Sequence, residues 1–220
     1  MWQTLIDDLN TSSFTVLAIA LDNSDAASPY IRAAAPTYPA LIDHDHHVAA
    51  LYNFKNVPEA VWIGESGRIV RPAETAGAYE AFRFIDPERK APTAEASAKK
   101  AAARDLYLNA LRDWVKFGSA SRYAMTADTV RSHLSRPTPE QSLAHVYFRL
   151  GCYLQLEGRE AEATRYMAEA SRLHPDSWAI WRQAAPKNAV GLAADQSFFD
   201  RVAALGEKRY YPAAPMEGMP

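Results

Sequence analysis

The segment FTVLAIALD at residues 14–22 places the strongest constraint on the fold. It is an almost unbroken apolar run, rich in residues that favour β-strands. A strand without polar alternation is typical of a parallel sheet that is covered on both faces. Short helical and extended patterns alternate around this run as far as residue 57. We expect helices at 2–10, 23–36 and 46–54, a second strand at 39–43, and a hairpin over 60–72. This alternation predicts an α/β domain.

The sequence pattern changes near residue 86, where Ala, Lys, Glu and Pro replace large apolar residues. From there on, the apolar spacing indicates helices and no further strand. The expected helices cover 104–117, 126–135, 139–156, 159–173, 176–184 and 195–205. The sequence therefore predicts an α/β domain over 1–85, a linker and helix start over 86–104, and an all-helical domain over 105–220.

One part of the helical half, YFRLGCYLQLEGREAEATRYMAEASRLHP, resembles a tetratricopeptide repeat, a hairpin of two antiparallel helices. Gly151 falls where the two helices must approach closely, and Ala163 and Ala170 are the small contact residues on the second helix. The resemblance implies a helical hairpin at about 142–175. Repeats of this kind often bind peptides or partner proteins, but the same helices could simply pack against the α/β domain.

The N-terminal half resembles the thioredoxin-like ResA/TlpA group of thiol–disulfide proteins. The matching pieces, in order, are WQTLIDDL, FTVLAIALD, YPALIDHDHHVAALYNFKNVPEAVWI and GESGRIV, and the helical tail is similar to that of a bacterial subgroup. The resemblance implies a thioredoxin-like fold with a cis Val57–Pro58 bond beside a groove for an extended peptide. It makes Val57, Pro58, Glu59 and Trp62 the candidate binding residues.

The chain departs from this family at the redox motif. Its one cysteine, Cys152, lies far from the matching segment, and the 220 residues contain no Cys-x-x-Cys pair. The family's central strand, which precedes the motif, has no counterpart either. Three arrangements remain open: the flanking strands 14–22 and 60–65 pair directly, a second copy covers the gap in a homodimer, or the natural chain starts further upstream.

We therefore expect a redox-inactive protein that binds a peptide or a protein partner and needs no cofactor. The alternative is an enzyme, either a truncated thiol–disulfide oxidoreductase or a hydrolase, for example one that cleaves glycosides. A hydrolase would draw its acid and base from scattered carboxylates, of which the candidates are Glu59, Asp43, Asp22 and Glu65.

The segment IDHDHHV contains side chains of the types that bind metals, and the candidate ligands are His44, Asp45 and His47. They follow a strand at a turn, where neighbouring side chains diverge, so we expect no metal site.

Charge and hydropathy exclude several classes of partner. The formal net charge is −2, which gives no electrostatic basis for binding nucleic acid. No apolar run reaches the length of a membrane span, so no membrane partner is expected. The N-terminus lacks the features of a secretory signal, and the expected location is cytoplasmic.

Overall fold

The computed structural model of the chain describes residues 1–9, 13–188 and 192–220. These residues form two compact units. Unit 1 contains residues 1–56 and 136–201, and unit 2 contains residues 57–135 and 202–220. The sequence analysis placed its boundaries near residues 86 and 105 because the composition changes there. In the structure, residues on both sides of that change pack within the same unit.

Unit 1 begins with a small α/β part. Strands β1 (Ala18–Ala20) and β2 (Ala40–Ile42) pair in parallel, with Ile19 opposite Leu41. Helix α2 (Ser24–Ala34) connects them and starts at Asn23, whose side chain accepts a hydrogen bond from the backbone N–H of Ala26 at 2.9 Å. The other helices of this part are α1 (Trp2–Leu9) and α3 (His47–Tyr52). The expected strand 14–22 is shortened to three residues, and each of them pairs with a residue of β2.

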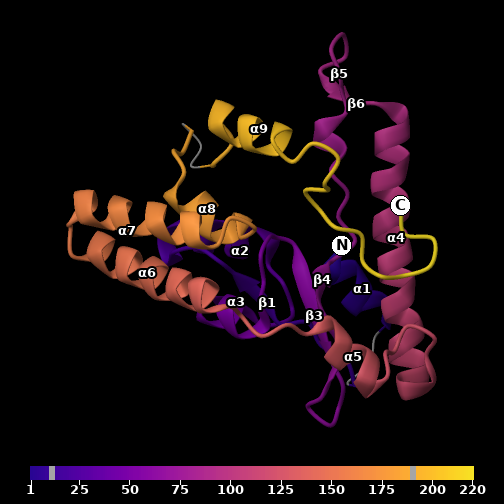
Figure 1. Cartoon of the computed structure of the whole chain (residues 1–220). Helices are drawn as coiled ribbons and strands as arrows, with labels where there is room; N and C mark the ends of the chain where they lie inside the picture. Colours follow the sequence, from indigo (N-terminus) through magenta and orange to yellow (C-terminus); the bar gives the residue numbers. More distant parts are fainter. Residues whose placement is uncertain (10–12, 189–191) are drawn as a thin grey trace. The chain divides into compact units, whose positions relative to one another are not determined.

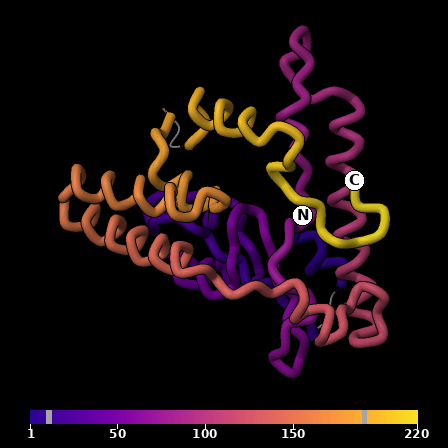
Figure 2. Tube along the Cα trace, in the orientation of Figure 1, coloured from indigo at the N-terminus to yellow at the C-terminus, as the bar shows by residue number. Residues whose placement is uncertain are grey.

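The rest of unit 1 is helical and agrees closely with the sequence prediction. Helix α6 (Pro139–Leu156) starts with a capping box between Thr138 and Gln141. It is followed by α7 (Glu160–Leu173) and α8 (Trp178–Ala184), and by α9 (Gln196–Ala203), which continues into unit 2. Helices α6 and α7 lie side by side as a hairpin (Figures 1 and 2).

A small residue allows the close approach of these two helices. A Cβ atom on Gly151 would lie 2.6 Å from Cγ of Met167, so only glycine fits there without a shift of the neighbouring side chain. The core between the helices contains Phe148, Met167 and Ile180, all almost fully buried. These contacts explain why the spacing of large and small residues in the sequence predicts the helical hairpin.

Unit 2 is built on an antiparallel hairpin and a long helix. Strands β3 (Glu59–Ile63) and β4 (Ile69–Thr75) pair antiparallel around the expected turn, in which Gly67 has a φ of 74°. Helix α4 (Ala94–Phe117) starts ten positions before the predicted residue 104, because Thr93 caps it by accepting a hydrogen bond from the N–H of Ala96. The shorter elements are α5 (Ala127–His133), the 3-10 helices η1 (Ala81–Arg83) and η2 (Gly118–Ala120), β5 (Ile85–Asp86) and β6 (Ala91–Pro92).

The strands confirm a mixed α/β structure, but they do not form one sheet. Within the described residues, β1–β2, β3–β4 and β5–β6 are three separate two-stranded sheets. Direct pairing of segments 14–22 and 60–65, one of the three arrangements considered, is therefore not observed. The β5–β6 pair also corrects the prediction that no strand follows residue 86: Ile85 pairs with Pro92, and Asp86 with Ala91. Two-residue strands carry too little alternation to be visible in a sequence.

Candidate functional site

The two carboxylates of unit 1 that were candidates for hydrolysis accept hydrogen bonds from nearby backbone N–H groups. Asp43 is buried, and its two oxygens accept hydrogen bonds from the backbone N–H groups of His47 at 2.8 Å and Ala49 at 3.1 Å. It therefore satisfies the free N–H groups at the start of α3. Asp22 is half-buried and accepts a hydrogen bond from the N–H of Asn23 at 2.8 Å.

The two candidate carboxylates of unit 2 lie at opposite ends of one strand. Glu59 is the first residue of β3, and Glu65 is exposed in the turn that follows it. Six residues of extended chain separate them by roughly 20 Å, which is too far for an acid–base pair of the glycosidase type. The structure does not bring these two side chains together.

The residues predicted to line a peptide groove around Pro58 differ in their exposure to solvent. The Val57–Pro58 peptide bond is cis, as the resemblance implies, and both residues are exposed. The carbonyl oxygen of Pro58 accepts a hydrogen bond from the N–H of Ala76 at 3.1 Å. Trp62 is only 3% exposed, and its indole N–H donates to the hydroxyl of Tyr107 at 2.8 Å. Trp62 is thus a core residue of unit 2 and is not available to a ligand.

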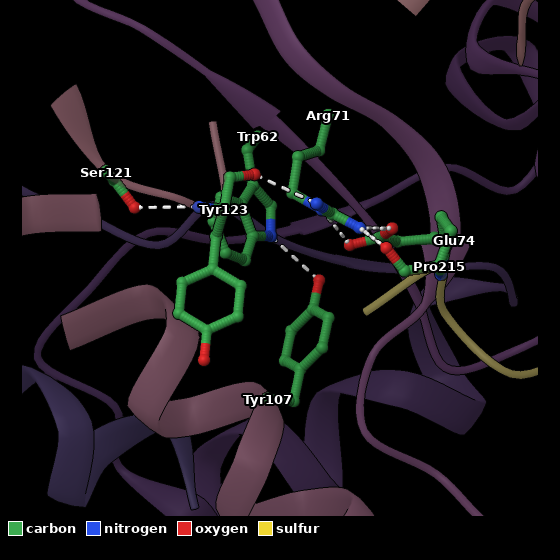
Figure 3. A network of polar contacts seen from close by, with 7 residues as sticks. All are labelled: Trp62, Arg71, Glu74, Tyr107, Ser121, Tyr123 and Pro215. Atoms are coloured by element: carbon green, nitrogen blue, oxygen red, sulfur yellow. Dashed lines mark hydrogen bonds and ion pairs between the residues drawn. The ribbon is translucent and has the colours of Figure 1, made fainter. Parts of the chain in front are cut away.

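Trp62 adjoins a buried network of polar contacts (Figure 3). The guanidinium of Arg71 lies 5.3 Å from the Trp62 ring centre and donates two hydrogen bonds of 2.8 Å to the carboxylate of Glu74. It also donates to the backbone oxygens of Tyr123 at 2.9 Å and Pro215 at 3.2 Å. Burial raises the pKa of Glu74, and the bonds from Arg71 oppose that rise.

Arg71 therefore links strand β4 to two distant segments of unit 2. Its donors are directed at protein acceptors, so the network has the properties of a structural ion pair. Sequence reasoning missed it because Arg71 and Glu74 lie three positions apart on a strand, with no motif around them.

The three candidate metal ligands do not form a cluster. His44 contacts its neighbour Asp45 through Nδ1 and Oδ1 at 2.9 Å, whereas His47 is exposed on the first turn of α3. No group of three metal-binding side chains occurs in the described parts of the chain.

The histidine of this segment that does enter the core is His46, which the sequence analysis did not select. It is 1% exposed, and its ring lies 4.4 Å from that of Phe148 on α6. Its Nε2 has no hydrogen-bond partner. Burial lowers the pKa of His46 to about 4, against the opposing effect of Asp43.

Two further histidines of unit 1 are also held neutral. The rings of His145 and His174 are 5.8 Å apart, edge to face. Burial lowers the pKa of His174 to about 4 and lowers that of His145 as well. Their positions in α6 and just after α7 show no common spacing, so only the packing of the helices reveals the pair.

Cys152 has the environment of an unreactive thiol. It is 3% exposed in the core of the α6–α7 hairpin, and burial raises its pKa to about 12. Because the thiolate is the reactive form, a thiol held protonated in this way is a poor nucleophile at neutral pH.

Among the described residues, an open groove of about 620 Å³ lies on the surface of unit 1. Its lining side chains come from α7 and the segment after it, from α8 and its C-terminal end, and from α9. Six are apolar, two are hydroxyls and two are arginines: Ala168, Pro175, Trp181, Ala184, Ala185, Pro186, Ser171, Ser197, Arg172 and Arg201. None of these lining residues is acidic.

Arg201 is the central charge of this groove. Its guanidinium lies 5.1 Å from the ring centre of Trp178 and 5.2 Å from that of Trp181, and it donates one hydrogen bond to the carbonyl of Pro175 at 2.5 Å. Burial lowers the pKa of Arg201, with only Asp176 acting against the shift. The neighbouring Arg172 is bound in a bidentate pair to Glu169. Arg201 thus keeps N–H donors beyond the bond to Pro175, while the nearby carboxylate of Asp176 favours its charged form.

No family model, curated protein or solved structure matches this chain. In the described part of the chain, no helix is both long enough and apolar enough to cross a bilayer.

Proposed function

We propose that this chain is a redox-inactive relative of the ResA/TlpA proteins that binds an extended, acidic segment of a peptide or protein partner. The groove around Arg201 is the observation that carries the proposal. It combines the aromatic ring of Trp181 with the guanidinium of Arg201, and none of its lining residues is acidic.

The order of elements supports the thioredoxin-like part of this proposal. A parallel pair β1–β2, connected by α2, is followed by α3 and by the antiparallel hairpin β3–β4, which is the order that the resemblance implies. The α6–α7 hairpin, with Gly151 against Met167, supports a tetratricopeptide-like unit. The burial of Cys152, the single cysteine, supports the absence of thiol–disulfide exchange in this chain.

The groove is suited to a carboxylate for a specific electrostatic reason. The Trp178 and Trp181 rings hold the Arg201 guanidinium in place and remove part of its hydration, and an incoming carboxylate can accept two parallel hydrogen bonds from it. Ser171 and Ser197 can donate to the same ligand, and the apolar rim can bury its aliphatic carbons. Charge and shape together favour an acidic peptide over a basic one.

The test is selection from a pooled library of short peptides, followed by fluorescence polarisation of the enriched sequences with the full chain. We expect enrichment of Asp and Glu and weaker binding as salt is added. Loss of a charge-assisted hydrogen bond costs about 1.5–3 kcal/mol, so Arg201→Gln should weaken binding roughly 10- to 100-fold.

The matched control is Arg165→Gln, an arginine of α7 that lies on the Tyr166 ring and does not line the groove. It should bind as the wild type does. A library with no enriched peptide, or enriched peptides that bind Arg201→Gln and wild type equally, would show that the groove is not the binding site.

A further inference from the structure

Helix α6 carries apolar side chains on the side opposite to its buried face. Ala144, Phe148 and Cys152 are buried in the core of unit 1. By contrast, Val146 is 50% exposed and Tyr153 is 55% exposed. An apolar face left open in this way is typical of an interaction surface.

The outward residues have the spacing of a helix–helix seam. Leu143, Val146, Leu150 and Tyr153 follow one another at intervals of three, four and three, and we call them the α6 seam. Leu143 is 41% exposed and Leu150 is half-buried. Intervals of three and four are those of the a and d positions in a coiled coil, which pack against another helix.

We propose that the α6 seam is the interface of a homodimer, in which α6 of one copy packs antiparallel to α6 of a second copy across a two-fold axis. The spacing of the four seam residues is symmetric about residue 148. Leu143 therefore faces Tyr153 of the second copy, and Val146 faces its Leu150. A two-fold interface must be self-complementary in this manner.

The charges at the two ends of α6 favour the antiparallel direction. Glu157 directly follows the last residue of α6, and Arg136 lies just before the N-terminal end of the helix; both are exposed. In the antiparallel pair, the Glu157 carboxylate of one copy lies beside Arg136 and the N-terminus of α6 in the other, where negative charge is stabilised. A parallel pair would instead place Glu157 against Glu157.

This interface differs from the gap in the sheet that first suggested a homodimer. It also leaves the groove around Arg201 open, because the residues that line the groove lie between 168 and 201 and none belongs to α6. Dimerisation and peptide binding are thus separable, and the dimer presents two grooves to a partner.

Sedimentation equilibrium of the full chain over a range of concentrations tests the proposal. We expect a monomer–dimer equilibrium. Val146→Glu places like charges in the seam and should raise the dissociation constant roughly tenfold or more. The control Tyr30→Glu changes a residue on α2 that is 72% exposed and should have no effect. Circular dichroism shows whether each variant keeps its helices.

Two further variants test the direction of the helices. Arg149 flanks the two-fold axis, so Arg149→Leu removes a like-charge contact and should tighten the dimer. In an antiparallel pair, Val146→Cys chains should form disulfides with Leu150→Cys chains and not with one another. A chain that stays monomeric, a dimer unaffected by Val146→Glu, or efficient disulfide formation by Val146→Cys alone would each overturn the proposal.

Discussion

Acidification should destabilise unit 1 through His46, and the magnitude can be worked out from its burial. The side chain is neutral in the folded state, with a pKa of about 4, whereas an exposed histidine has a model value of 6.5. Above the unfolded pKa the residue is neutral in both states and has no effect. As the pH falls towards 4, the unfolded chain takes up a proton that the folded chain excludes, so the free energy of unfolding decreases.

For His46 alone, the difference between the folded and unfolded pKa corresponds to a loss of about 3 kcal/mol in the free energy of unfolding at low pH. About 2 kcal/mol of this is lost between about pH 7 and about pH 5. His174, whose pKa is also lowered to about 4, should increase the loss. Carboxylates with ordinary pKa values contribute little over this range, since most of them titrate below it.

Urea unfolding followed by tryptophan fluorescence, repeated across this pH range, measures the loss. His46→Asn is the matched variant, because asparagine tolerates the positive φ of 53° at this position and does not titrate. It should be less stable at neutral pH, since the contact with Phe148 is lost, but its stability should depend less on pH. A wild type whose stability is constant from neutral to acidic pH, or a variant with an unchanged pH dependence, would refute the reasoning.

Two further predictions concern unit 2. Gly77→Ala should destabilise it by about 2–4 kcal/mol in thermal or urea unfolding, because the residue has a positive φ and the new Cβ would lie 2.9 Å from Cβ of Tyr107. The control Gly67→Ala also has a positive φ, but nothing lies within 4 Å, so its cost should be about 1 kcal/mol; equal losses for the two would contradict the packing argument. Arg71→Met should cost about 3–5 kcal/mol by leaving Glu74 buried without its cation, and the double variant Arg71→Met/Glu74→Leu should recover much of that loss. A double variant less stable than Arg71→Met would contradict this account.

Much of the local structure was predictable because short-range signals determine it. Helix α6 runs over the predicted residues 139–156, since Thr138 caps it and Pro139 is accepted in the first turn. The hairpin β3–β4 follows from the turn at Gly67, which needs a positive φ. The α/β character of the N-terminal half likewise follows from alternating apolar patterns.

The candidate site was less predictable because burial depends on distant residues. His44, His46 and His47 look alike in the sequence, yet only His46 packs on Phe148 in the core. Trp62 was expected at a binding surface, but Tyr107 on α4 covers it. Nothing in the sequence near Arg201 indicates that its guanidinium lies over Trp178 and Trp181.

Local signals in the sequence, namely capping residues, glycines and apolar spacing, indicated helix α6 and the β3–β4 turn, because such signals act within a few positions of one another; they did not indicate the start of α4 or the β5–β6 pair. The way in which segments combine became visible in the fold, where 136–201 join the first 56 residues in one unit. The fold also determines which charged side chains are paired, as Arg71 is with Glu74. Both outcomes involve contacts between residues far apart in the chain, where the free energy of burial depends on the partner and not on the local pattern.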